Sequence, residues 1–261
     1  MPEINQNLIL AGRVAADIHT GVARLIKPGV NLLSLEDYVK ALMKTAKVSP
    51  AFLGYKNYPA ASCLSVNSAV VHAPPRDYVL RDGDVLSVDL GVEKNGWIVD
   101  TAWTHAVGRV SPRINQLLSV TKTALNLAIK VARPGNHTGD IGHIVQKTIE
   151  QAGFYIIRDL TGHGVGRKLQ MPPNIPNFGR AGTGAIIKEG MILAIEPITA
   201  LEKVSLSIEG DNWTIRAKPD VICAHFEHTV AVTASGPVVL TDSTAFPPHF
   251  PTKSYGLTNR P

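Results

Sequence analysis

Apolar side chains recur at intervals of three and four residues in two segments near the N-terminus, which predicts two amphipathic helices. The first segment runs from Asn5 to Ile26 and ends at Lys27-Pro28-Gly29. The second helix is expected to begin after Ser34, a good N-cap residue, with two acids in its first turn, Glu36 and Asp37.

A second pair of helices follows the same pattern later in the chain. Ser111-Pro112 opens a long amphipathic segment, with proline at the favoured first helical position, and Arg133-Pro134-Gly135 closes it. Thr138 is expected to cap a further helix that ends near Gly153. Each pair of helices is therefore divided by a Pro-Gly turn.

Apolar runs after each helix pair predict strands that carry acids. Strands at 85–92 and 97–104 flank the turn Glu93-Lys94-Asn95-Gly96, whose Asn-Gly pair is a strong hairpin signal. Asp89 and Asp100 are equally distant from the centre of this turn, so their side chains are expected to converge across the two strands. Glu196 ends the strand 192–195, and Glu227 lies inside a strand-like run at 225–232.

The spacing of these features indicates an internal duplication. Gly83 and Gly190 each precede a strand and are 107 residues apart, as are Asp89 and Glu196. The sequence therefore predicts one α+β domain over 1–245, built from two related halves (about 1–108 and 109–245) that face each other across a central site. Residues 246–261, rich in proline, are predicted to be a C-terminal extension.

Four carboxylates within or next to apolar strands would repel one another, and a bound metal ion would relieve this repulsion. Lys and Arg are absent from the centres of these strands, and buried carboxylates are costly unless a cation or a donor meets them. His163, between glycines in Gly162-His163-Gly164, adds an imidazole. Such ligands suit two divalent ions that share carboxylates, which can activate water for hydrolysis of an amide. A Ser nucleophile motif of the GxSxG type is absent, and nothing partners Cys63.

Several motifs in the same order resemble the type I methionine aminopeptidases of the pita-bread fold. The motifs are Gly54-Tyr55, Tyr58-Pro59, Ser65-Val66-Asn67, Asp100-Thr101, 162–167, Ile195-Glu196-Pro197 and Phe226-Glu227-His228-Thr229, together with Cys63, His72, Asp89. The resemblance covers nearly the whole chain, to about Thr241. It implies a pita-bread fold with two pseudo-twofold-related halves around a central antiparallel sheet, and removal of the initiator methionine from nascent proteins.

The resemblance also implies roles for individual residues. The ligands of two divalent ions (Co, Mn, Fe, Ni or Zn) would be Asp89, Asp100, His163, Glu196 and Glu227, with Asp100 and Glu227 bridging. Glu196 would also relay a proton, and His72 would hydrogen-bond the scissile amide. The methionine pocket would be lined by Phe52, Tyr55, Tyr58, Cys63 and Trp213. Taken without the family, His72 is a structural histidine after a short strand, and the aromatic residues are core.

Some positions depart from the family pattern. Gln170 occupies the place of a second catalytic histidine, seven residues after His163, and glutamine can hydrogen-bond but cannot carry a proton. His72 is followed by Ala73-Pro74-Pro75, where the family commonly has Gly-Ile-Pro. These departures leave two alternatives open: a catalytically weak paralogue that binds peptides or ribosomes, and another aminopeptidase of the same fold.

Composition narrows the setting. The chain has 261 residues, of which 44% are hydrophobic, but it contains no apolar run that could cross a membrane, and no signal peptide is expected from its N-terminal residues. Two cysteines give no disulfide framework, so the cytoplasm is the expected compartment. A monomer is the expected state. The net charge of +5 fits ordinary solubility, or attraction to a polyanion such as ribosomal RNA during a transient ribosome contact.

Overall fold

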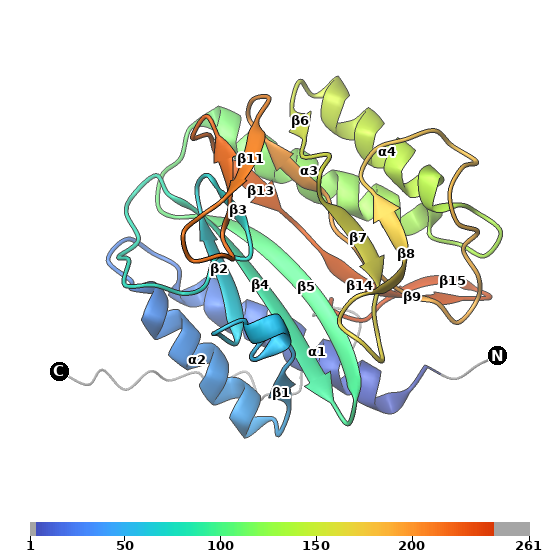
Figure 1. Cartoon of the computed structure of the whole chain (residues 1–261), viewed down its shortest axis with the longest axis horizontal. Coiled ribbons are helices and arrows are strands. Elements are labelled where there is room, and N and C mark those ends of the chain that lie inside the picture. Colours follow the sequence, from blue (N-terminus) through green and yellow to red (C-terminus); the bar gives the residue numbers. More distant parts are fainter. Residues whose placement is uncertain (1–3, 243–261) are drawn as a thin grey trace.

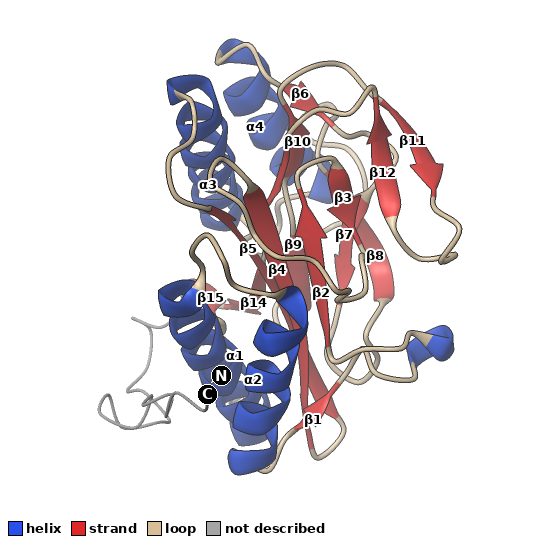
Figure 2. Cartoon of the chain, turned by 90° about the vertical axis from the view of Figure 1, so that its left-hand side faces the viewer, coloured by secondary structure: helices blue, strands red, loops and turns tan. Residues whose placement is uncertain are grey.

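The structure is a computed structural model that describes residues 4–242. The predicted extension at 246–261 lies outside the described residues. In this described part of the chain, four long helices pack on one side of the strands, and the short helix η1 lies on the other side (Figure 2). Their bounds are α1 (Gln6–Leu25), α2 (Leu32–Thr45), α3 (Pro112–Val131), α4 (Thr138–Gln151) and η1 (Tyr55–Asn57).

Within residues 4–242, the strands form four sheets in which every pairing is antiparallel. The first sheet contains β1 (Ser49–Pro50), β2 (Ser62–Val66), β4 (Val85–Lys94) and β5 (Trp97–Ala106). The largest sheet contains β7 (Thr161–Gly164), β8 (Met171–Pro176), β9 (Ile192–Ile195), β14 (His228–Thr233) and β15 (Gly236–Val239). Two three-stranded sheets contain β6 (Tyr155–Ile156), β10 (Ile198–Ala200) and β13 (Cys223–His225), and β3 (Ala69–Val71), β11 (Ser205–Ile208) and β12 (Ile215–Lys218).

The predicted repeat is visible in matching elements of the two halves (Figure 1). α1 and α3 have 20 residues each, and α2 and α4 have 14 each. Gly29 and Gly135 both have φ of 90°, a conformation that glycine adopts without strain. The Gly29 N–H donates to Leu80 O at 2.8 Å, and the Gly135 N–H donates to Ile187 O at 3.0 Å. The same turn therefore ties each helix pair to the segment that leads into its acid-bearing strand.

Each helix pair buries its apolar face against its own strands. Residues of α1, α2, β2 and β4 form one large hydrophobic cluster, and residues of α3, α4, β9 and β14 form another. Between these clusters, β5 contacts both β4 and β14, so the first and largest sheets meet along β5. The segregation of helices from antiparallel strands confirms the predicted α+β class.

Several predicted boundaries move by a few residues. α2 begins at Leu32 because Asn31, not Ser34, is its N-cap, and the Asn31 side chain accepts from Leu33 N at 2.9 Å. α4 has His137, not Thr138, as its N-cap, and the Asp140 carboxylate accepts from His137 N at 2.6 Å. The run predicted as one strand at 225–232 is interrupted at 226–227, and its two parts belong to different sheets.

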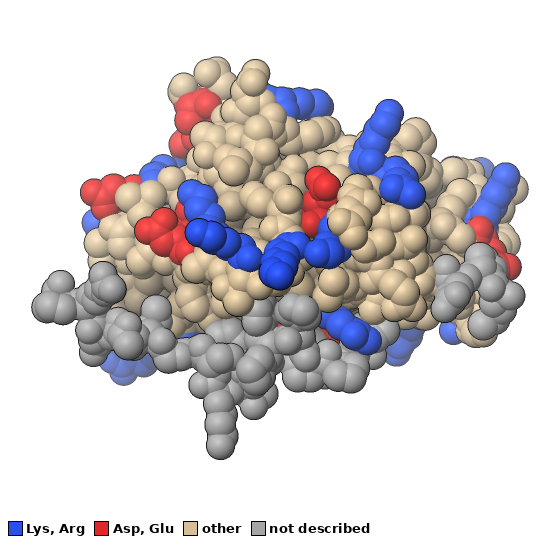
Figure 3. All heavy atoms as spheres, turned by 90° about the horizontal axis from the view of Figure 1, so that it is seen from below, with Lys and Arg blue, Asp and Glu red and all other residues tan. Residues whose placement is uncertain are grey.

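The surface carries the net positive charge without a single dense basic cluster on the face shown in Figure 3. There, Lys and Arg side chains form a loose row across the middle, with acidic side chains beside them. Within residues 4–242, none of the helices combines the length and apolar character needed to span a bilayer. The ribosome contact expected from the charge stays a prediction.

Candidate metal centre

Four carboxylates meet where the first and largest sheets join. Asp89 lies on β4 and Asp100 on β5, while Glu196 directly follows β9 and Glu227 lies between β13 and β14. The Glu227 N–H donates to Ala102 O at 2.8 Å, and the Ala102 N–H donates to Glu227 O at 3.3 Å. This pair of hydrogen bonds places Glu227 beside the strand that carries Asp100.

The register of the hairpin differs from the prediction. Gly91 lies opposite Asp100, and Asp89 lies opposite Ala102, so the two acids are diagonal neighbours and not equally distant from the turn. The reason is that strand pairing continues to Lys94 and Trp97, so the turn contains only Asn95 and Gly96 and its centre lies one residue further along the chain than expected. Diagonal neighbours still share a face, and long side chains reach across that separation.

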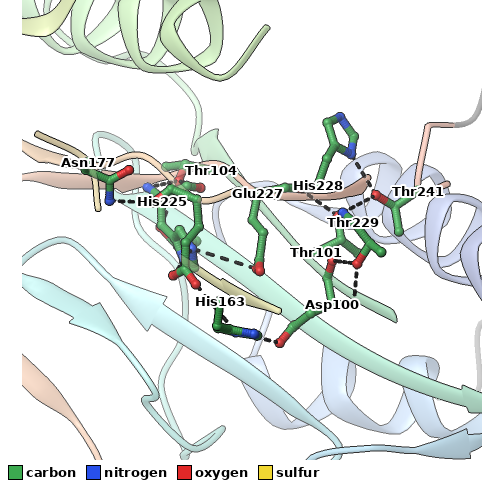
Figure 4. Close-up of polar contacts among 12 residues, drawn as sticks. Asp100, Thr101, Thr104, His163, Asn177, His225, Glu227, His228, Thr229 and Thr241 are labelled. Carbon is green, nitrogen blue, oxygen red and sulfur yellow. Dashed lines mark hydrogen bonds and ion pairs between the residues drawn. The ribbon is translucent and has the colours of Figure 1, made fainter. Parts of the chain in front are cut away.

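His163 faces the acids from β7. Its Nδ1 lies 2.9 Å from Gly164 O, which fixes the ring, and its Nε2 lies 3.6 Å from Glu196 Oε1. The same Nε2 lies 3.8 Å from Asp100 Oδ2 (Figure 4). Potential ligand atoms of Asp100, His163 and Glu227 all lie within 4.8 Å of one another. The five predicted ligands therefore come together from three strands and two connecting segments.

Burial and mutual repulsion oppose ionisation of this cluster. Burial, followed by the nearby Asp100 charge, raises the pKa of Asp89 well above its usual range. Burial and the charge of Glu196 do the same to the pKa of Asp100, and burial and Asp100 raise the pKa of Glu227. Burial also raises the pKa of Glu196 to about 7, an effect that His163 opposes. Four acids at one buried point are therefore unfavourable as anions unless a cation joins them.

The residues fit a divalent metal site. Asp89 Oδ1, Asp100 Oδ1 and Glu227 Oε1 are buried and have no hydrogen-bond partner among the residues that the structure describes. Leaving a buried charged group unsatisfied costs about 1–3 kcal/mol or more. Carboxylate oxygens and imidazole nitrogen are the usual donors to hydrolytic divalent metals, so divalent ions held by these residues would supply the missing partners.

A cavity of ≈ 300 Å³ opens above the acids, and all of the sequence-predicted site residues line it. His72, which directly follows β3, has φ of 60° and projects into this cavity. Burial, then the charges of His225 and His163, lowers the pKa of His72 to about 4. Its imidazole is therefore neutral near pH 7, with one ring nitrogen able to donate and the other able to accept.

Aromatic side chains form one wall of the cavity. Phe52, Tyr58 and Cys63 are buried in one small cluster, with Tyr55 and Trp213 packed against it. The Tyr58 ring meets Trp213 edge to face at 5.0 Å between centroids. An apolar, aromatic wall with a soft thiol suits an unbranched thioether side chain. Burial and, to a smaller extent, the nearby Asp89 charge raise the pKa of the Cys63 thiol, so this cysteine stays protonated.

Comparisons with known proteins decide the family. The family model described as "Metallopeptidase family M24" matches residues 6–234. The chain belongs to metallopeptidase family M24.

Relatives of this M24 chain are named methionine aminopeptidases. Methionine aminopeptidase 1 of Bacillus subtilis is 38% identical over 231 residues, which are 88% of this chain and 93% of that protein. Methionine aminopeptidase of Aquifex aeolicus is 40% identical over 243 residues, 89% of this chain and 93% of that one. The crystal structure of methionine aminopeptidase from Thermotoga maritima matches with a TM-score of 0.90 and 39% identity, covering 93% of this chain and 99% of that chain.

More distant structures share the fold alone. Prolidase from Pyrococcus furiosus matches with a TM-score of 0.73 and 23% identity, and this chain covers 63% of that one. The resemblance to methionine aminopeptidases and the predicted pita-bread fold are confirmed by these comparisons. The roles of individual site residues in this M24 chain stay predictions.

The sequence reasoning missed some residues of the cavity. His225 is 3% exposed and lines the cavity, as do Leu169, Ile198, Lys56 and Asp159. His225 precedes Glu227 by two residues, and residues two apart in an extended segment share a face. This spacing was the available signal. The cavity role of the others depends on contacts between distant segments, for which a local pattern carries no signal.

Gln170 lies at the cavity rim. The Tyr55 hydroxyl donates to Gln170 Oε1 at 3.4 Å, so the two side chains meet across the opening. The amide NH₂ of Gln170 remains able to donate to a peptide that enters between them.

Proposed function

We propose that this chain removes the initiator methionine from nascent proteins by metal-dependent hydrolysis of the first peptide bond. The observation that carries the proposal is the convergence of five ligand-type side chains beneath a cavity with an aromatic wall. The names of its relatives support the same reaction. Nascent peptide N-termini as partners, the cytoplasm as compartment, a transient ribosome contact and a monomeric state belong to this proposal as predictions from the sequence.

Each group in the cavity has a defined task. Asp89, Asp100, His163, Glu196 and Glu227 would hold the divalent ions. Bound divalent metal supplies a Lewis acid for the carbonyl and lowers the pKa of water, which makes hydroxide available near neutral pH.

The chain's own residues bind the substrate and move the proton. The aromatic wall takes the methionine side chain and excludes water from it, which sets the scissile bond above the acids. A Glu196 carboxylate oxygen accepts the proton of the attacking water and delivers it to the leaving amine. His72, neutral near pH 7, donates its ring N–H to the scissile amide and stabilises the charge that develops there. Gln170 donates to the backbone of the peptide at the rim.

Hydrolysis of a Met-Ala-Ser peptide tests the proposal. Chelator-treated protein should be inactive, and a divalent ion such as Mn²⁺ or Co²⁺ should restore release of free methionine. A Leu-Ala-Ser peptide of the same length is the control, and its cleavage should be at least tenfold slower because its branched side chain fits the aromatic wall less well.

Two results would contradict the proposal. A protein that binds metal but releases no methionine would favour the binding paralogue. Equal cleavage of both peptides would favour a general aminopeptidase of the same fold.

A further inference from the structure

His225 is a buried imidazole that the proposed chemistry leaves without a task. It ends β13 and is 3% exposed, yet it lines the catalytic cavity. Its Nε2 makes no hydrogen bond with any part of the chain that the structure describes. The same atom lies 3.4 Å from Glu196 Oε2. It also lies 3.9 Å from Glu227 Oε2, so it is aimed at the acids (Figure 4).

The backbone of His225 is anchored by one hydroxyl. Thr104 Oγ1 accepts from the His225 N–H at 2.8 Å and donates to His225 O at 2.7 Å. Ser87 Oγ lies 2.8 Å from the same Thr104 oxygen. Because a hydroxyl donates once and accepts twice, Ser87 is the donor in that contact, and the bonding capacity of Thr104 is full. These hydrogen bonds fix the backbone from which the His225 imidazole extends toward the cavity.

Glu196 lies between two imidazoles. Its Oε1 is 3.6 Å from His163 Nε2, and its Oε2 is 3.4 Å from His225 Nε2. Asn177 Nδ2 donates to the backbone oxygen of Glu196 at 2.8 Å and fixes the start of the side chain. With His163 assigned to a metal ion, His225 is the neighbour left to orient the outer oxygen of this carboxylate.

We propose that His225 is a positioning residue whose Nε2–H donates to Glu196 Oε2 and holds that carboxylate in its productive orientation. The inference rests on the proposed function, because Glu196 is there both a metal ligand and the proton carrier. A ring shift of a few tenths of an ångström brings the 3.4 Å separation to an ordinary hydrogen bond. This bond also satisfies the buried ring nitrogen, whose isolation is otherwise costly.

The test compares His225→Leu, which removes the donor, with His225→Gln, which keeps a neutral donor. Titration calorimetry with Mn²⁺ alone measures metal affinity and stoichiometry, and kinetics with Met-Ala-Ser measures kcat and KM. Partners that orient metal ligands typically contribute 10–100-fold to affinity or activity. For His225→Leu we therefore expect Mn²⁺ affinity and kcat each to fall about 10–100-fold, with KM within threefold and stoichiometry unchanged. His225→Gln should recover most of both losses.

A second pair of variants tests the same inference if His225→Leu folds poorly. Thr104→Val removes the anchoring hydroxyl at nearly constant shape, and Thr104→Ser keeps it. Mn²⁺ affinity should fall in Thr104→Val and be restored in Thr104→Ser.

Three results would overturn the inference. Wild-type affinity and kcat in both His225→Leu and Thr104→Val would make His225 a packing residue. Loss of one Mn²⁺ equivalent in His225→Leu would make it a metal ligand. Equal losses in His225→Gln and His225→Leu would exclude a hydrogen-bond donor role. If wild-type protein binds Mn²⁺ but releases no methionine, the proposed function fails, while the affinity comparison still tests His225.

Discussion

His19 should make the metal-free protein sensitive to mild acid. This histidine lies on α1, is 6% exposed, and its Nε2 is 3.1 Å from Thr101 O. Its other ring nitrogen, Nδ1, is buried without a hydrogen-bond partner in the described part of the chain. The pKa of His19 is lowered to about 3, mainly by burial. The contact with Thr101 O raises this pKa, and the neighbouring His105 and His228 lower it further. Folded protein therefore keeps His19 neutral at pH values where the unfolded chain takes up a proton.

The sign and size follow from that difference. The folded pKa is below the unfolded value of 6.5, so the free energy of unfolding is unaffected above pH 7 and falls as pH drops below 6.5. For each pH unit over which only the unfolded chain binds the proton, the free energy of unfolding falls by about 1.36 kcal/mol. Between pH 6.5 and 5 the loss from His19 is therefore about 2 kcal/mol, out of a total stability of about 5–15 kcal/mol for a typical domain.

His19→Gln isolates this effect because glutamine does not titrate and retains an amide donor for Thr101 O. Urea unfolding of chelator-treated protein at pH 8 and pH 5 gives four free energies of unfolding. Wild type should lose about 2 kcal/mol more between the two pH values than His19→Gln does. A constant cost of the substitution cancels in this comparison.

Ile18→Val is the matched control on the same helix. Ile18 is fully buried, and the removed methyl group costs about 0.5–1.5 kcal/mol at both pH values. Its loss between pH 8 and pH 5 should equal that of wild type. If wild type and His19→Gln lose the same free energy on acidification, His19 does not titrate as its burial requires, and the reasoning is wrong.

Three further predictions concern the cavity. Asp100→Asn should abolish methionine release and remove the thermal stabilisation by metal, which is about 2.7 kcal/mol at a metal concentration of 100 times Kd, and a melting curve with and without Mn²⁺ measures this. Trp213→Ala should raise KM for Met-Ala-Ser about tenfold, equal to about 1.4 kcal/mol, with unchanged Mn²⁺ affinity by calorimetry; a selective loss of metal instead would remove Trp213 from the pocket. Gln170→Ala should lower kcat/KM about tenfold, the worth of one lost hydrogen bond, and Gln170→His should be nearly neutral; equal activity of all three forms would leave Gln170 without a catalytic role.

Local sequence patterns predicted the helices and the acid-bearing strands because each depends on contacts close in sequence. Pro-Gly turns and Asn-Gly fix the backbone locally, and Asp89 and Asp100 stand out because charge is unexpected in an apolar strand. The hairpin register was wrong because four turn-forming residues, 93–96, are consistent with a four-residue turn or a two-residue turn. Pairing of Lys94 with Trp97 selects the shorter one.

Features that depend on distant segments were not predictable in this way. Glu36 resembles an acid placed for the helix dipole, but it is buried and accepts from Ala61 N at 2.8 Å and Ser62 Oγ at 2.6 Å, which ties α2 to the segment before Cys63. The 225–232 run mixes polar and apolar residues and contains no glycine or proline that would mark an interruption. It breaks because Glu227 pairs with Ala102 of the other sheet, a contact that no local spacing encodes.

Threonine hydroxyls explain how two separate sheets hold one set of acids in register. Thr229 Oγ1 donates to Asp100 O at 2.7 Å and accepts from the Asp100 N–H at 2.8 Å, which mirrors the contact of Thr104 with His225 (Figure 4). β5 thus anchors a residue of β13, and β14 anchors a residue of β5. Backbone hydrogen bonds between strands fix residues within one sheet only. Where the two sheets separate, these threonine hydroxyls make the hydrogen bonds to the backbone instead. Thr101 Oγ1 also donates to Glu227 O at 2.9 Å. The backbones of the two acids predicted to bridge the metals, Asp100 and Glu227, are therefore connected through threonine side chains. Valine keeps the shape of threonine but removes this connection, so these positions require a hydroxyl even though they never face the cavity.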